Sequence, residues 1–145
     1  MNKKELIRIL SQVFIPSGFR KKGNYWVMTG EEITKMINLQ KSKYGNFYYI
    51  NYGYNINSIP LDKGMMHIYN RVTSFNAEER DRITFLLNLD SSVSDEQREY
   101  ELKQILERLI SNIQSVNSED SLLNELKNRS HLNDIPLVVK KHFNI

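Results

Sequence analysis

Two neighbouring segments of alternating side chains are the feature that most limits what this chain can fold into. Residues 32–42 and 47–57 alternate between apolar and polar side chains, which is typical of β-strands that bury one face. Only the four residues Lys43-Tyr44-Gly45-Asn46 separate the two segments. Because a parallel pair needs a connection of about a dozen residues or more, these strands are predicted to pair antiparallel.

Shorter segments extend this sheet. Residues 24–28 are aromatic and β-prone, and a turn signal at 29–31 follows them. Residues 65–72 predict another strand, with Met66, Ile68 and Val72 on one side and His67, Tyr69 and Arg71 on the other. Residues 83–89, after a loop at 76–81, predict one more strand. We therefore expect an antiparallel sheet of four to five strands.

Long helices are predicted before and after the strands. Residues 3–15 form an amphipathic pattern that Asn2 can cap. Residues 95–116 follow the capping residue Ser94 and have the strongest helical periodicity in the sequence. The apolar side chains of this second helix are Leu102, Ile105, Leu106, Leu109, Ile110 and Ile113.

Two shorter helices complete the prediction. Ser118 can cap a short leucine-rich helix, and Pro136 can open a final helical turn. The order of helix, strands and helices predicts an α+β fold. We expect a single domain over residues 1–145, with the N-terminal helix and the C-terminal helices packed on one face of the sheet.

The composition excludes several kinds of chemistry. With 145 residues, 40% hydrophobic and 26% charged, the chain has the profile of one globular domain. It contains no cysteine, which excludes a disulfide framework, a thiolate nucleophile and a zinc–thiolate site. Its three histidines lack metal-ligand spacing, and no glycine-rich phosphate loop or G-x-S-x-G elbow is present. We therefore expect neither a metal nor a cofactor.

Charge is distributed unevenly along the chain. Residues 1–72 contain 11 Lys and Arg against 4 Asp and Glu, whereas residues 73–145 contain 9 against 13. A basic region can indicate an anionic partner, but two oppositely charged halves can also attract each other within the fold. No apolar stretch approaches the roughly 20 residues of a membrane span, and a secretory signal is missing. We expect a cytoplasmic protein that does not bind membranes.

The polar sides of the predicted strands contain the candidate binding residues. These are Gln40, Lys41, Lys43, Tyr49, Asn51, His67, Tyr69 and Arg71, with Asn38 and Asn55 on the same face. Arg71 can pair bidentately with a carboxylate or a phosphate. However, antiparallel sheets commonly keep one polar face in solvent without any ligand. A shift of one residue in register would also turn the whole set toward the core.

Three functions are compatible with this face: binding a protein, binding nucleic acid, and catalysis. Basic residues beside aromatic ones, as in Arg20-Lys21-Lys22 before Tyr25-Trp26, can bind single strands, although an RNP1 signature is absent. A small enzyme would centre on His67 and Arg71, because an imidazole with a reference pKa of about 6.5 is the best acid–base candidate. A hydrogen-bonded structural role is the simpler interpretation of His67.

Two runs of the sequence resemble a known family. Residues 18–26 (GFRKKGNYW) and 38–45 (NLQKSKYG) are similar to bacterial family 4304 of the domains of unknown function, and His67 and Arg71 fit the same pattern. The resemblance implies a small bacterial cytosolic domain without an assigned activity or catalytic residues. Because such families sometimes occur near toxin–immunity systems, it favours a non-catalytic, immunity-like module for a protein partner. A nucleic-acid-binding domain and the small enzyme remain the alternatives.

Overall fold

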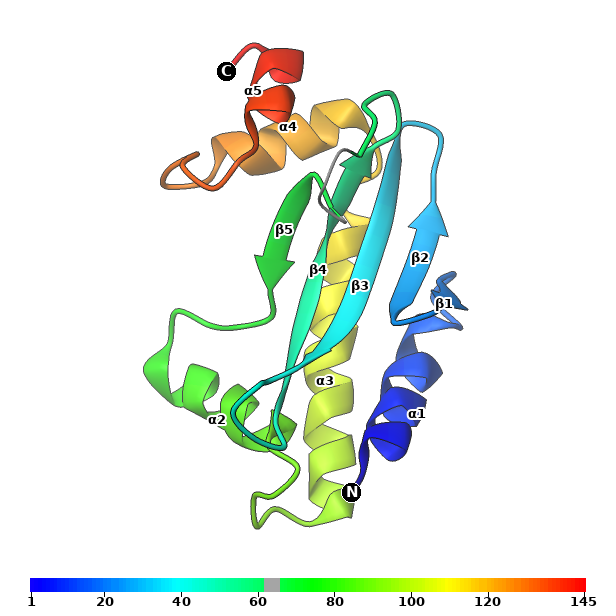
Figure 1. Cartoon of the computed structure of the whole chain (residues 1–145), viewed down its shortest axis with the longest axis vertical. Coiled ribbons are helices and arrows are strands. Elements are labelled where there is room, and N and C mark those ends of the chain that lie inside the picture. Colours follow the sequence, from blue (N-terminus) through cyan, green and yellow to red (C-terminus); the bar gives the residue numbers. More distant parts are fainter. Residues whose placement is uncertain (62–65) are drawn as a thin grey trace.

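The computed structural model describes residues 1–61 and 66–145, and its centre is one antiparallel sheet (Figure 1). Five strands follow one another in the order β1-β2-β3-β4-β5, so each strand pairs with its neighbour in the sequence. Their bounds are β1 (Arg20–Lys22), β2 (Tyr25–Thr29), β3 (Ile33–Lys41), β4 (Tyr48–Ile56) and β5 (Ile68–Arg71). The predicted antiparallel sheet is confirmed. The predicted start of the fourth strand at Met65 lies outside the described residues.

The hairpin of β3 and β4 has the predicted alternation. Ile37 lies opposite Tyr52, and Gln40 lies opposite Tyr49, in one uninterrupted register. Along β3 the side chains of Ile33, Lys35, Ile37 and Leu39 are buried, whereas the alternate side chains of Thr34, Met36, Asn38 and Gln40 are more exposed. The sheet therefore has one face toward the core and one face away from it.

Two long helices cover the core face. Figure 1 shows α1 (Lys3–Phe14) and α3 (Asp95–Gln114) behind the sheet. Asn2 caps α1 in a capping box, and the Ser94 side chain accepts a hydrogen bond from the backbone at the start of α3, as predicted. The indole of Trp26 on β2 packs edge-on against Phe14 at 5.3 Å between ring centroids and donates to Ser11 Oγ at 3.1 Å. These contacts connect the sheet to α1.

The C-terminal helices follow their predicted caps. Ser118 caps α4 (Glu119–Lys127), and Pro136 directly precedes α5 (Leu137–Phe143). Both helices lie beyond one end of the sheet (Figure 1). None of the helices in the described part of the chain is both long and apolar enough to cross a membrane.

The strand predicted at residues 83–89 is wrong. This region belongs to α2 (Ala77–Leu87), whose N-cap Asn76 accepts a hydrogen bond from the Glu79 backbone. Helix α2 buries Ile83, Leu86 and Leu87, the i, i+3 and i+4 positions of one helix face. A short apolar run does not distinguish a strand from a buried helix turn, and here tertiary packing selected the helix. The fifth strand is instead β1, whose three basic side chains carry no apolar alternation.

A buried arginine organises the connection between α2 and α3. The guanidinium of Arg98 donates to the Leu86 carbonyl at 2.5 Å and to the Asn88 carbonyl at 2.9 Å. It also reaches the Ser91 and Val93 carbonyls at 3.3 and 3.4 Å. Burial lowers the pKa of Arg98, and nearby Asp95 partly opposes that shift. Arg98 therefore satisfies backbone carbonyls that the end of α2 would otherwise leave unpaired.

Candidate functional site

One face of the sheet points away from α1 and α3, and we call it the open face. Strand register and alternation assign its side chains: Arg20, Lys22, Tyr25, Val27, Thr29, Thr34, Met36, Asn38, Gln40, Tyr49, Asn51, Asn55, Tyr69 and Arg71. Among these described positions are three cations and no Asp or Glu. The open face is therefore positively charged.

Arg71 is the centre of a hydrogen-bond network on the open face. Its Nε donates to Asn51 Oδ1 at 3.1 Å, and one of its terminal nitrogens donates to Gln40 Oε1 at 3.2 Å. Asn51 Nδ2 donates to the same Gln40 oxygen at 3.0 Å. The guanidinium lies 4.0 Å from the centroid of the Tyr49 ring. Three adjacent strands thus hold the cation in place.

Asn51 stabilises this network from below. Only 1% of the residue is exposed, and its side-chain oxygen and nitrogen each have a hydrogen-bond partner. A buried amide with both groups satisfied restricts the rotamers of its neighbours. The bonds from Arg71 to Asn51 and to Gln40 occupy two of its five N–H donors, which leaves donors for a carboxylate or phosphate.

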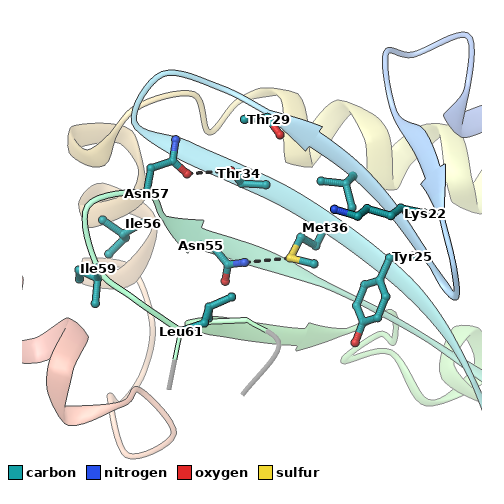
Figure 2. Close-up of a pocket in the computed structure, with 11 residues that line it drawn as sticks. Lys22, Tyr25, Thr29, Thr34, Met36, Asn55, Ile56, Asn57, Ile59 and Leu61 are labelled. Carbon is teal, nitrogen blue, oxygen red and sulfur yellow. Dashed lines mark hydrogen bonds between the residues drawn. The ribbon is translucent and has the colours of Figure 1, made fainter. Parts of the chain in front are cut away.

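A hollow of about 510 Å³ lies on the open face toward the other end of β3 and β4. Figure 2 shows Lys22 and Tyr25 at one side of it, Met36 and Asn55 on its floor, and Leu61 near its rim. The Asn55 amide nitrogen contacts the Met36 sulfur. Burial raises the pKa of the Tyr25 hydroxyl, and a hydrogen bond with Asn38 opposes this shift. The hollow combines a cation and hydrogen-bonding groups with apolar surface.

The sequence analysis named Asn55 on the candidate face, and Lys22 and Tyr25 only as part of a basic and aromatic segment; it did not predict that these side chains line one hollow. Lys22, Tyr25 and Met36 reach the open face because β2 pairs with β3 through Tyr25 opposite Asn38 and Val27 opposite Met36. Tyr25 also precedes the buried Trp26 in the strand, so the alternation of side chains was an available signal. The missing information was the existence of β1.

The structure brings together half of the predicted site residues. Gln40, Tyr49, Asn51 and Arg71 form the network, and Tyr69 lies on the same face of β5 with its side chain partly exposed. Asn38 and Asn55 also lie on this face. Lys41 and Lys43 are exposed at the end of β3 and in the turn after it, at the margin of the open face.

His67 does not join the network. It is 5% exposed, and its ring Nδ1 accepts a hydrogen bond from the Ile56 backbone N–H at 2.9 Å. The backbone N–H of His67 donates to Asn55 Oδ1 at 2.9 Å. With the Nδ1 position accepting, the ring proton of the neutral form is on Nε2, which faces the Pro60 carbonyl at 3.3 Å. His67 directly precedes β5, and its imidazole accepts a hydrogen bond from the backbone N–H of Ile56, the last residue of β4. The expectation that His67 presents its ring on the polar face is therefore corrected, and the geometry disfavours His67 as an acid–base group.

The comparisons with known proteins identify a family. No curated protein and no solved structure is similar enough to match the chain. Residues 10–125 match the family described as Domain of unknown function (DUF4304). This match covers all five strands and the long helix α3, including the Arg71 network. The chain therefore belongs to the family Domain of unknown function (DUF4304).

Proposed function

We propose that this chain is a non-catalytic binding module that holds an acidic surface of a protein partner on the open face of its sheet. The observation that carries the proposal is the charge of that face. Arg20, Lys22 and Arg71 lie on it, and no carboxylate lies among its described positions. Neutralisation of a partner in the manner of an immunity protein is one form that such binding would take.

The held position of Arg71 also supports this proposal. A cation that is already ordered by Asn51 and Gln40 loses less side-chain entropy when it pairs with a carboxylate. Tyrosine and arginine are enriched among the residues that dominate protein–protein binding energy. The open face also presents Tyr69 and Tyr25 beside the network. Arg71 with Tyr69 is the expected centre of the interface.

Single-stranded nucleic acid is the second candidate ligand, because tyrosines and cations share the open face. Stacking of bases requires accessible ring faces. The guanidinium of Arg71 already covers one face of Tyr49, and Tyr25 is partly buried. Fewer rings are therefore available for stacking than the sequence suggests, which favours a protein partner.

A charge-reversal experiment tests the proposal. The tagged full chain captures proteins from a lysate of its source cells after nuclease treatment, and the bound proteins are quantified by mass spectrometry. The double variant Arg20→Glu/Lys22→Glu reverses two open-face charges, and Lys4→Glu/Lys127→Glu makes the same net change on two exposed helix positions. Any protein retained by the wild type and by the helix variant is purified and titrated calorimetrically against all three chains.

The expected result is a defined partner that binds the wild type and the helix variant alike and binds the open-face variant at least about tenfold more weakly. Arg71→Ala is expected to weaken the same complex. Equal binding by all three chains would refute the open face as the interface. A parallel capture from lysate without nuclease is the comparison: proteins that bind only in that untreated lysate would instead support the nucleic-acid alternative.

A further inference from the structure

The outer edge of β5 is a second surface, next to the open face. Among the described residues β5 is the last strand of the sheet and pairs with β4 alone. In Figure 1 no strand or helix runs along its outer side. The opposite edge, β1, has only three residues, all basic, which is a common protection against strand pairing. The edge of β5 lacks this protection.

The hydrogen-bond pattern identifies which backbone groups this edge presents. The Val72 N–H donates to the Ile50 carbonyl at 2.8 Å, in the same register that places Tyr52 opposite Asn70. Hydrogen-bonded and non-hydrogen-bonded pairs alternate in an antiparallel ladder. Asn70 therefore bonds to β4, while the N–H and C=O groups of Tyr69 and Arg71 point outward. Within the described residues these outward groups have no backbone partner.

A cavity of about 640 Å³ opens beside this edge. Its lining includes the helix-facing Asn70 and the open-face Arg71 of β5, Thr73 to Phe75 of the following loop, and residues between Asn128 and Asp134 after α4. Phe75 is fully exposed at this loop. A cavity of this size accepts a large side chain.

We propose that an extended peptide segment of a partner protein adds as a sixth strand to the outer edge of β5 and inserts alternate side chains into this cavity. The outward N–H and C=O groups of Tyr69 and Arg71 provide the backbone bonds, as in other cases of strand addition. The side chains between the inserted ones lie beside Tyr69 and Arg71. This inference goes beyond the proposed function, because it rests on the backbone edge of β5 and the cavity beside it; Tyr69 and Arg71 belong to both surfaces, but the charges of Arg20 and Lys22 do not enter it.

The charges of the cavity specify the inserted side chain. Arg129 has only 16% of its side chain exposed and is held by Asn70 Oδ1 at 2.6 Å, by Glu125 and by Asp134. Asp134 is far more accessible, with 56% of its side chain exposed. Asp134 is therefore the more accessible charge of this pair, and it favours a Lys or Arg side chain. The exposed Arg71, which also lines the cavity, favours a neighbouring acidic one.

The surroundings of the edge favour a slender segment over a second copy of this chain. The loop with Phe75 and the segment at 128–134 both line the cavity, so chain lies on either side of the place where the added strand would enter. A peptide fits between these segments. The edge of another folded sheet would meet them before its backbone reached β5.

A matched pair of substitutions tests the backbone contact. Tyr69→Pro removes an outward N–H while leaving the bonds between β4 and β5, since proline is tolerated on edge strands where its nitrogen faces outward. Tyr69→Thr removes the same ring and keeps the N–H. Peptides are selected from a displayed random-peptide library on the wild-type full chain, and synthetic copies are titrated against both variants. Thermal melts verify that each variant is folded.

The expected result is enrichment of peptides with alternating basic and acidic residues. Their affinity should be at least about tenfold weaker for Tyr69→Pro than for Tyr69→Thr, because both variants lack the ring and only the proline lacks the N–H. A measurement on the wild-type chain supplements the variants. Two peptides are compared, one N-methylated at every odd residue and one at every even residue. Binding should be lost only when the methylated N–H groups are those that point toward β5. Failure to enrich any peptide, equal binding by the two variants, or insensitivity to the phase of methylation would each overturn the proposal.

The same titration separates this proposal from the proposed function. The double variant Arg20→Glu/Lys22→Glu changes β1, the strand at the opposite edge of the sheet from β5, and should leave peptide binding unchanged. Peptides that respond to that double variant and not to Tyr69→Pro would place binding on the open face and overturn strand addition. Loss in Tyr69→Pro alone supports the edge, whatever the lysate experiment finds.

Discussion

Replacing Gly53 with alanine should detach β5 from the sheet and so disturb both surfaces at once. A Cβ atom at Gly53 would lie 1.8 Å from the Ile68 carbonyl oxygen and 2.8 Å from the Met66 sulfur. The sulfur belongs to a flexible side chain that can move. The carbonyl belongs to the backbone of β5, so relief requires the strand itself to shift away from β4.

The expected cost follows from what β5 contributes. Its ladder with β4 includes the pairs of Tyr52 with Asn70 and Tyr54 with Ile68, and each hydrogen bond is worth about 1 kcal/mol net. The Ile68 side chain is fully buried, which contributes about 1.5–3 kcal/mol. Partial displacement should therefore lower the free energy of unfolding by about 3–5 kcal/mol, with a fall in Tm of roughly 10 °C.

The assay combines denaturant unfolding with amide hydrogen exchange. Gly53→Ala should lower the unfolding midpoint and reduce the protection of the Asn70 and Val72 amides, which bond to β4. Gly23→Ala is the matched control, because no atom lies within 4 Å of its added Cβ, although its positive φ of 61° costs about 1 kcal/mol. A Gly53→Ala protein with a Tm within about 3 °C of the wild type and normal protection at both amides would refute the close approach.

Three further predictions concern individual polar groups. Arg98→Ala should lower the free energy of unfolding by about 3 kcal/mol or more in denaturant titrations, because it leaves backbone carbonyls without donors; a loss below about 1 kcal/mol would show that water replaces the guanidinium. Arg71→Ala should cost about 1–2 kcal/mol in the same assay by removing a donor to the buried Asn51, and a double-mutant cycle with Asn51→Ala should show that the two losses are not additive. The hydrogen bond from Arg82 holds the pKa of Glu101 at about 2, below its ordinary 4.5, so this pair stabilises the fold above about pH 4.5 and loses that effect as the pH falls toward 2. Acid titrations of stability should therefore be less steep in this interval for Arg82→Ala than for the wild type, and identical curves would contradict the assignment.

Local patterns were sufficient to predict the hairpin and the helix starts. Alternation in β3 and β4 placed Gln40, Tyr49 and Asn51 on one face, because the side-chain period of a strand is set by its backbone alone. Asn2, Ser94 and Ser118 marked the beginnings of helices because their short side chains accept the free N–H groups of the first turn. These features depend on residues within a few positions of one another.

Local patterns failed where distant contacts decided the outcome. Residues 83–89 were predicted as a strand, yet packing against the core made Ile83, Leu86 and Leu87 one side of a helix. The three basic residues of β1 carried no alternation and became a strand by pairing with β2. For α2 the deciding contacts are with the core, which a local window does not contain. For β1 the partner strand is only Gly23 and Asn24 away, so the available signal was the two-residue turn and not the alternation of side chains.

By itself, the sequence determined an antiparallel sheet with one apolar and one polar face and the helices that cover the apolar one, since these follow from periodicity and capping. Only the tertiary structure decided what the polar groups do. It used the His67 ring to satisfy the Ile56 amide and stacked Arg71 over Tyr49. It also placed Arg129 against Asn70, 59 positions away, to form the cavity at the β5 edge. Such pairings depend on strand order and chain crossings, and neither can be read from the spacing of residues along the chain.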